Sequence, residues 1–265
     1  MMTDKTIQEL EQNWKNYRTM INDHPAIISV NMDMFEDLRD DYLNKVAAFS
    51  QPYDADEEGL PKPGTQENVL RNLAKILTQL NALNDVLYAG HIISNGEVKL
   101  YFYIEYPELF IETAKQFVAA DKITIQEDPE WDIYFDFLLP SKVEVKFDLT
   151  EEILNTMAEN GLDLSQTYYI EHRFHFDNKD DMDNFIEQCR FLDISFTTIK
   201  YTDTPVQLEN MPNEQYLLKL EQEIPLDTQD IFKSVELFEE MVRDYHGEYT
   251  GWESIDPNED KKYVN

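Results

Sequence analysis

Two histidines stand three residues apart in the stretch TYYIEHRFHF, and this pair is the first grouping in the chain that suggests chemistry. His172 and His175 could share a metal ion only if both side chains pointed to the same side of the backbone. The alternation of apolar and polar residues predicts a strand here, and residues three apart on a strand point to opposite faces. We therefore expect no metal site at this pair. We interpret His172, on the apolar face, as a hydrogen-bonded histidine of the core.

The single cysteine is the next group with chemical potential. Cys189 falls on the apolar stripe of a predicted helix, together with Phe185, Ile186 and Leu192. A reactive thiol needs exposure and an electropositive setting, so we predict that Cys189 is buried and inert. One cysteine cannot form an intramolecular disulfide, which is typical of proteins from a reducing cytoplasm.

The sequence contains no other catalytic pattern. Its seven glycines form neither a G-x-G-x-x-G fingerprint nor a Walker A loop, and no G-x-S-x-G elbow is present. The acidic stretch Asp177–Asp183 lacks the glycine and spacing of an EF-hand. It overlaps a predicted helix N-terminus, where carboxylates interact favourably with free amides. We expect a protein that is not an enzyme and that has no metal site and no cofactor.

The chain is strongly acidic. Of 265 residues, 54 are acidic and 22 are basic, which gives a formal net charge of −32 that both halves share. This charge repels nucleic-acid phosphates and anionic membrane surfaces, so we expect neither as a direct ligand. It suits a partner with a basic patch, although it would also serve solubility alone. The N-terminus lacks the features of a signal peptide, and no apolar run approaches ~20 residues, so we expect a cytoplasmic protein.

Hydrophobic periodicity predicts alternating helices and strands in the first half. The Asn95-Gly96 dipeptide is the strongest turn signal, because both residues tolerate the positive φ of a tight hairpin. The predicted elements are a helical lead-in over Trp14–Met20, a strand over Ala26–Met34, helices over Glu36–Ala48 and Glu67–Leu83, strands over Val86–Ser94 and Glu97–Tyr106, a helix from Pro107, and strands over Lys122–Gln126 and Trp131–Pro140.

The pattern restarts near Ser141–Phe147. The elements expected in the second half are a helix capped by Asp148 with Glu151 and ended by Gly161, a strand over Thr167–Phe176, a helix capped by Asn178 or Asp177, strands over Ile194–Tyr201 and Gln215–Ile224, a helix over Thr228–Tyr245 capped by Asp227, and a last strand over Glu248–Ile255. Both halves thus predict β-α-β-β-α-β. The expected fold is α+β, with two tandem ferredoxin-like (split βαβ) sandwiches of antiparallel sheets. The expected domains are residues 1–141 and 148–265.

Three stretches of the second half carry a resemblance to a known family. They are YYIEH at Tyr168–His172, EYTGWE at Glu248–Glu253 and DPNED at Asp256–Asp260. On these residues the second half resembles the regulator of ribonuclease E activity B family (RraB), which are small acidic bacterial proteins with a ferredoxin-like fold. In the first half, Trp14, Tyr17 and the stretch Asp128–Ser141 resemble a family of unknown function (DUF695), which brings no established activity.

The resemblance implies a function in protein binding, since the RraB family inhibits an endoribonuclease by associating with its scaffold region. We therefore expect a non-catalytic regulator that modulates a ribonuclease, with a basic partner such as that scaffold. The alternative is an immunity-type antitoxin that neutralises a basic nuclease toxin. Gly251 would permit a bend in an edge strand, and Trp252 would either pack in the core or dock the partner. The predicted partner-binding residues are Glu171, His172, Arg173, Tyr249, Gly251, Trp252 and Glu253.

Overall fold

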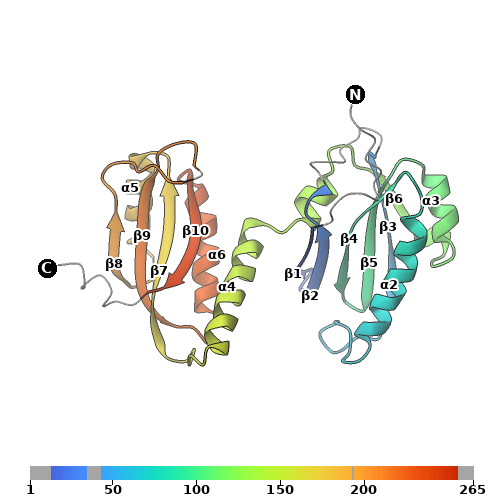
Figure 1. Cartoon of the computed structure of the whole chain (residues 1–265), viewed down its shortest axis with the longest axis horizontal. Coiled ribbons are helices and arrows are strands. Elements are labelled where there is room, and N and C mark those ends of the chain that lie inside the picture. The colour runs from blue at the N-terminus through green and yellow to red at the C-terminus, as the bar shows by residue number, and fades with distance from the viewer. Residues whose placement is uncertain (1–12, 35–42, 193, 210, 256–265) are drawn as a thin grey trace. The chain divides into compact units, whose positions relative to one another are not determined.

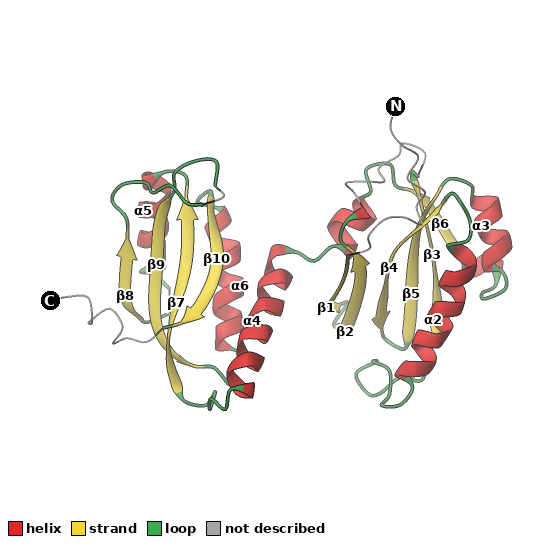
Figure 2. Cartoon of the chain, viewed as in Figure 1, coloured by secondary structure: helices red, strands yellow, loops and turns green. Residues whose placement is uncertain are grey.

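A computed structural model describes residues 13–34, 43–192, 194–209 and 211–255. The chain divides into two compact units, Met1–Ser141 and Lys142–Asn265. Each unit is an antiparallel sheet with helices packed on it, as Figures 1 and 2 show. The α+β class and the two antiparallel sheets are therefore confirmed.

The first unit is built on a six-stranded sheet in the order β1-β2-β4-β5-β3-β6. Its elements are β1 (Trp14–Ile21), β2 (His24–Asn31), β3 (Lys45–Pro52), α2 (Gln66–Leu80), β4 (Val86–Ser94), β5 (Glu97–Ile104), α3 (Pro107–Ala114), β6 (Thr124–Glu127) and a helical segment over Ile133–Leu138. The predicted hairpin turn is confirmed, because Asn95 and Gly96 have φ angles of 46° and 78° between β4 and β5.

Both faces of this first sheet are buried. Helices α2 and α3 cover one face, where Phe110 packs with Phe49 and Phe102 of the strands. The segment that contains Trp131 and Tyr134 covers the other face. A sheet covered on both sides presents apolar side chains in both directions, and its central strands β4 and β5 accordingly contain unbroken buried runs at residues 86–90 and 100–104.

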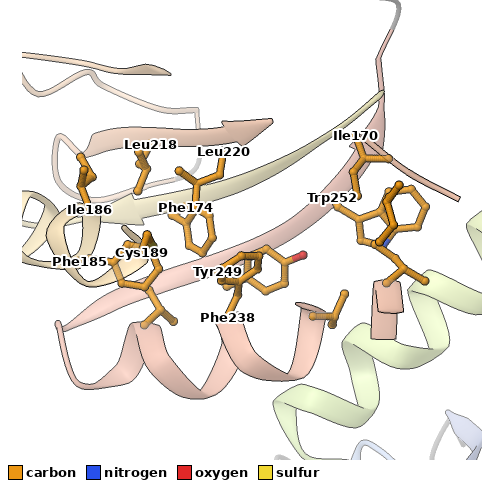
Figure 3. Packing of buried hydrophobic residues seen from close by; sticks show 14 of the residues in the cluster. Ile170, Phe174, Phe185, Ile186, Cys189, Leu218, Leu220, Phe238, Tyr249 and Trp252 are labelled. Atoms are coloured by element: carbon orange, nitrogen blue, oxygen red, sulfur yellow. The ribbon is translucent and has the colours of Figure 1, made fainter. Parts of the chain in front are cut away.

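The second unit contains a four-stranded sheet in the order β10-β7-β9-β8. Its elements are α4 (Lys142–Glu159), β7 (Thr167–Phe176), α5 (Lys179–Cys189), β8 (Phe196–Tyr201), β9 (Tyr216–Pro225), α6 (Asp230–Arg243) and β10 (Gly247–Ser254). One core lies between the sheet and the helices, with Phe174, Phe185 and Phe238 near its centre (Figure 3). Asn178 caps α5, since its side chain accepts a hydrogen bond from the Asp181 amide at 2.9 Å.

The two units share one arrangement of strands. In the first unit, β3-α2-β4-β5-α3-β6 gives the strand order β6-β3-β5-β4, and in the second unit, β7-α5-β8-β9-α6-β10 gives β10-β7-β9-β8. The element order of both is the split βαβ arrangement. The hairpin β1–β2 extends the first sheet beyond β4. The second unit instead adds α4 in front of its first strand.

Two predicted helices of the first half are wrong. Trp14–Met20 belongs to β1, because this segment pairs along its whole length with β2. Of the helix expected over Glu36–Ala48, residues 36–42 lie outside the described residues, while Lys45–Ala48 begins β3. Strand β3 has buried side chains on both faces, and a continuous apolar run of this kind cannot be distinguished from a helix by its period.

The strand predicted over Trp131–Pro140 is also wrong. Residues Ile133–Leu138 are helical, and the buried members Trp131, Tyr134 and Leu138 follow a spacing of three and four rather than two. Asp128 starts this turn by accepting hydrogen bonds from the amides of Asp132 and Ile133. A local carboxylate cap of this kind overrides the β propensity of an aromatic stretch.

Two predicted helix caps in the second half need correction. Helix α4 begins at Lys142, so Asp148 and Glu151 lie inside it and form no capping box. Helix α6 begins at Asp230, and Asp227 is not its N-cap residue. Asp148 cannot act as a cap because only the first turn of a helix has free amides, and α4 is already helical at this residue. For α6 the helix starts later than expected, and Gln229 is at the N-cap position.

Cys189 is buried in the core of the second unit, as predicted. Burial raises the pKa of its thiol to about 12, so almost no thiolate is present at neutral pH. We expect the native protein to resist a maleimide reagent for hours and the denatured protein to react within minutes. The measurement is mass spectrometry of timed samples. Labelling of the native protein at the rate of the denatured protein would contradict this prediction.

Candidate partner-binding site

The seven predicted site residues lie on two neighbouring strands, β7 and β10. In the antiparallel register, Glu253 is opposite Glu171, Trp252 is opposite His172, and Gly251 is opposite Arg173. The strands therefore bring the two sequence stretches together. Because side chains alternate along β7, Glu171 and Arg173 point away from the helices while His172 points toward them. The structure thus divides the seven residues between two faces of the sheet.

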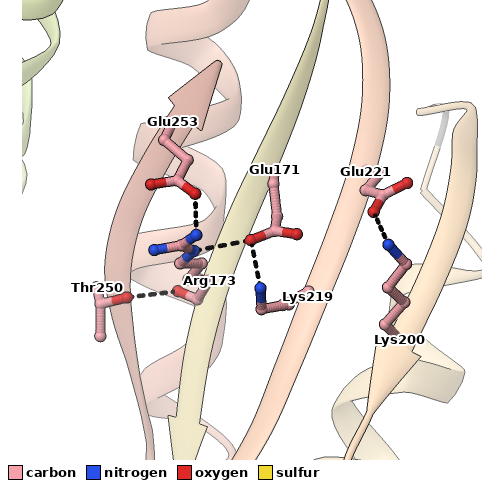
Figure 4. Close-up of polar contacts among 7 residues, drawn as sticks. All are labelled: Glu171, Arg173, Lys200, Lys219, Glu221, Thr250 and Glu253. Carbon is pink, nitrogen blue, oxygen red and sulfur yellow. Dashed lines mark hydrogen bonds and ion pairs between the residues drawn. The ribbon is translucent and has the colours of Figure 1, made fainter. Parts of the chain in front are cut away.

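The face of the second sheet that points away from its helices carries a network of ion pairs (Figure 4). Arg173 binds Glu171 through Nε at 2.8 Å and binds Glu253 through its second guanidinium nitrogen. Lys219 of β9 also reaches Glu171, with 2.8 Å between Nζ and Oε1. Burial alone would raise the pKa of Glu171, but the hydrogen bonds from Lys219 and Arg173 outweigh it and hold the pKa below its usual value.

A second ion pair extends this network toward β8, where Lys200 Nζ lies 2.7 Å from Glu221 Oε1. Glu171, Arg173, Lys219 and Glu221 lie on this face of β7 and β9 (Figure 4). The middle of the face is therefore a charged surface.

His172 is a core residue, as predicted from the sequence. Its side chain is fully buried, and its Nδ1 lies 2.8 Å from the hydroxyl of Tyr249 in a hydrogen bond. Burial lowers the pKa of His172 to about 3, so the imidazole is neutral at physiological pH. His175 points to the other face. Across the described ranges, no three His, Cys, Asp or Glu side chains are grouped so that they could hold a metal ion.

Gly251 allows β10 to bury both of its aromatic residues. The register with β7 shifts between Tyr249 and Gly251, which leaves Thr250 as the extra residue of a β-bulge. Gly251 has a φ of 124°, a conformation that L side chains rarely adopt. Without the bulge, Tyr249 and Trp252 would point to opposite faces. With it, both side chains enter the core, Tyr249 beside Phe174 and Trp252 nearer Ile170 (Figure 3). The predicted bend in an edge strand is confirmed.

Trp252 packs in the core, which resolves the choice left open by the sequence. Its side chain is 7% exposed, and its indole Nε1–H donates a hydrogen bond to Thr150 Oγ1 of α4 at 3.0 Å. Trp252 thus ties α4 to β10. Sequence reasoning did not include α4 in the site, because only the folded chain shows which helix lies beside β10.

A groove runs between α4 and β10, with a volume of about 250 Å³. Leu149 and Ile153 of α4 and Trp252 provide apolar walls, while Glu152 and Glu253 bring carboxylates to it. Lys146 of α4 donates a hydrogen bond from Nζ to the backbone oxygen of Thr250 at 3.0 Å. We call this feature the α4–β10 groove. The sequence signal that could have indicated it is Leu149, an apolar residue that does not fit the buried stripe of its helix.

Each unit matches a family model. The second unit matches the family model described as Regulator of ribonuclease activity B over residues 147–254. The first unit matches the model described as Family of unknown function (DUF695) over residues 12–139. The two matches follow one another along the chain, in the order that the sequence motifs indicated.

Other comparisons add little. No curated protein matches the chain. Among solved structures, an unknown protein from Galdieria sulphuraria matches 80% of this chain and 98% of its own chain, with 7% sequence identity and a TM-score of 0.24. That score is too low to support a common fold. Within the described residues, no helix has the length and apolar character needed to span a membrane.

Proposed function

We propose that this protein regulates a ribonuclease by binding to it, and that it carries out no chemistry of its own. The match of the second unit to the Regulator of ribonuclease activity B family carries this proposal. The match includes strands β7 to β10 and most of α4, and hence the ion-pair network and every residue of the α4–β10 groove except Lys146.

The charge of the protein supports a basic partner. A surface that binds RNA is rich in lysine and arginine. A chain with a formal net charge of −32 is attracted to such a surface and would compete with RNA for it. We therefore propose that the partner is a basic region of the ribonuclease, that binding inhibits cleavage, and that the protein acts in the cytoplasm. Neither RNA nor a membrane is a direct ligand in this proposal.

We expect affinity for the ribonuclease to weaken by roughly tenfold or more when salt rises from about 50 mM to about 300 mM, because exposed charges are screened over shorter distances. The measurement is calorimetric titration of the full-length protein into the purified ribonuclease of the same organism, with RNA cleavage followed in parallel. A neutral protein of similar size serves as the control. Absence of association at every salt concentration, with the folded protein intact by circular dichroism, would overturn the proposed function.

A further inference from the structure

We propose that the α4–β10 groove receives one apolar side chain from a basic, extended segment of the partner. This inference rests on the proposed function, and it adds the place and the chemistry of the contact. The groove lies within the second unit, and its walls come from elements that the hydrogen bonds of Lys146 and Trp252 hold together. It is therefore a feature of one folded unit.

The size of the groove favours a side chain over a small molecule. Its volume of about 250 Å³ lies below the ~300–1,000 Å³ of typical small-molecule sites. Leu149 is 46% exposed at the groove although it is apolar, and Ile153 is half-buried beside it. An apolar side chain placed here would remove both from water. The free protein therefore leaves apolar area in contact with water at the groove, and a side chain of a partner would cover it.

The position beside an edge strand favours an extended segment. Strand β10 pairs with β7 alone in the described part of the sheet, and an extended segment along such an edge turns every second side chain to the same side. The backbone oxygen of Thr250 is already bonded to Lys146, and the bulge lies at the same point. Bulges and lysines disfavour regular strand pairing. The side chain in the groove, rather than a full ladder of backbone bonds, is therefore the anchor.

The charges at the groove favour a basic segment. Glu152 lines the groove and, among the described residues, has no cation within 4.0 Å in an ion pair. Glu253 is half-exposed at the same place and is paired with Arg173. The two cations of the groove are engaged, Lys146 with a carbonyl and Arg173 with two carboxylates. A second copy of this chain would bring a further formal charge of −32 and is disfavoured as the occupant.

The test uses two fluorescent peptides of seven residues and the full-length protein. Both peptides alternate lysine and arginine, and they differ only at the centre, which is leucine in one and serine in the other. We expect the leucine peptide to bind at least about tenfold more tightly than the serine peptide, because only the leucine buries an apolar side chain in the groove. The affinities are measured by fluorescence anisotropy. Equal affinity of the two peptides would overturn the proposal.

Two matched variants locate the binding site. Leu149→Glu places a charge at the groove, whereas Leu162→Glu places the same charge on an equally exposed leucine (46%) that does not line the groove. We expect Leu149→Glu to abolish the preference for the leucine peptide and Leu162→Glu to retain it, with melting curves showing that both variants are folded. Retention of the preference by Leu149→Glu would overturn the proposal.

Measurements of binding to the ribonuclease distinguish a failure of the groove proposal from a failure of the proposed function. If the wild-type protein and the Leu149→Glu variant bind the ribonuclease equally well, the groove proposal fails and the proposed function stands. If the leucine preference depends on Leu149 but the wild-type protein does not bind the ribonuclease, the groove proposal is supported and the proposed function fails. Loss of ribonuclease binding in Leu149→Glu, but not in Leu162→Glu, supports both.

Discussion

Replacement of Trp252 by alanine is expected to destabilise the second unit by about 3–5 kcal/mol, the usual cost of removing a large aromatic side chain from a core. The indole is 7% exposed and belongs to the core that contains Phe174 and Phe238 (Figure 3). Its loss also leaves the hydroxyl of Thr150, which is itself buried, without the indole as a hydrogen-bond donor. The variant removes packing and a hydrogen bond in a single step.

Hydrogen exchange followed by mass spectrometry is the suitable measurement, because it reports stability for each unit separately. Amides of β7 should exchange faster in Trp252→Ala, while amides of β5 in the first unit serve as an internal reference. Trp252→Phe is the matched variant: it keeps most of the apolar contact, loses the Nε1–H donor, and should cost only about 1–2 kcal/mol. A loss below about 1 kcal/mol in Trp252→Ala would contradict the assignment of Trp252 to the core.

The second unit was more predictable from the sequence than the first, and the reason is physical. Strand β7 contacts the hydrophobic core through one face only, so apolar and polar residues alternate along most of it, and the alternation is visible in TYYIEHRFHF. Strand β3 of the first unit is buried on both faces, and the same rule led to a helix. Glycine-containing turns such as Asn95-Gly96 were predictable in both units, because they depend only on local backbone conformation.

The candidate site could be predicted only in part. The motifs located β7 and β10, and the structure brings these strands side by side. Which residues face the helices depends on the bulge at Thr250, and the sequence indicates a bulge only through the glycine that follows. The contribution of α4 could not be predicted, since the contacts of Thr150 and Lys146 with β10 span about a hundred residues of sequence.

The two units share a strand order but differ in what lies on the sheet face opposite the helices of the split βαβ arrangement. In the first, the sheet face opposite α2 and α3 is covered by Trp131 and its neighbours and is apolar. In the second, the corresponding face is not covered by any described segment of its own unit and is occupied by ion pairs of Arg173 and Lys219. The carboxylate of Glu171 in these pairs is buried, and a buried ion pair is weak evidence for stability because the cost of desolvation offsets the attraction. Their place on this sheet is therefore better explained by solubility and partner choice than by folding.

The segment that covers the first sheet depends on one carboxylate, and Asp128→Ala is expected to destabilise the first unit by about 3–5 kcal/mol. Asp128 is buried and accepts hydrogen bonds from the Tyr103 hydroxyl at 2.5 Å and from the amides of Asp132 and Ile133 at 2.9 and 3.1 Å. Burial, and then the neighbouring carboxylate of Asp128, raise the pKa of Tyr103, which keeps this hydroxyl protonated as a donor. Each bond to a charged group contributes about 1.5–3 kcal/mol, and an orphaned buried donor adds a desolvation cost.

The effect of Asp128→Ala should reach beyond the three bonds themselves. Tyr103 also accepts a hydrogen bond from the Tyr134 amide and stacks on Trp131, with 4.1 Å between ring centroids. We expect amides of β5 to exchange faster while amides of β7 report no change. The control is Asp136→Ala, an exposed carboxylate of the same helical segment. Equal exchange in the two variants would show that the buried carboxylate does not hold this segment, because a general effect of lost charge would act at both positions.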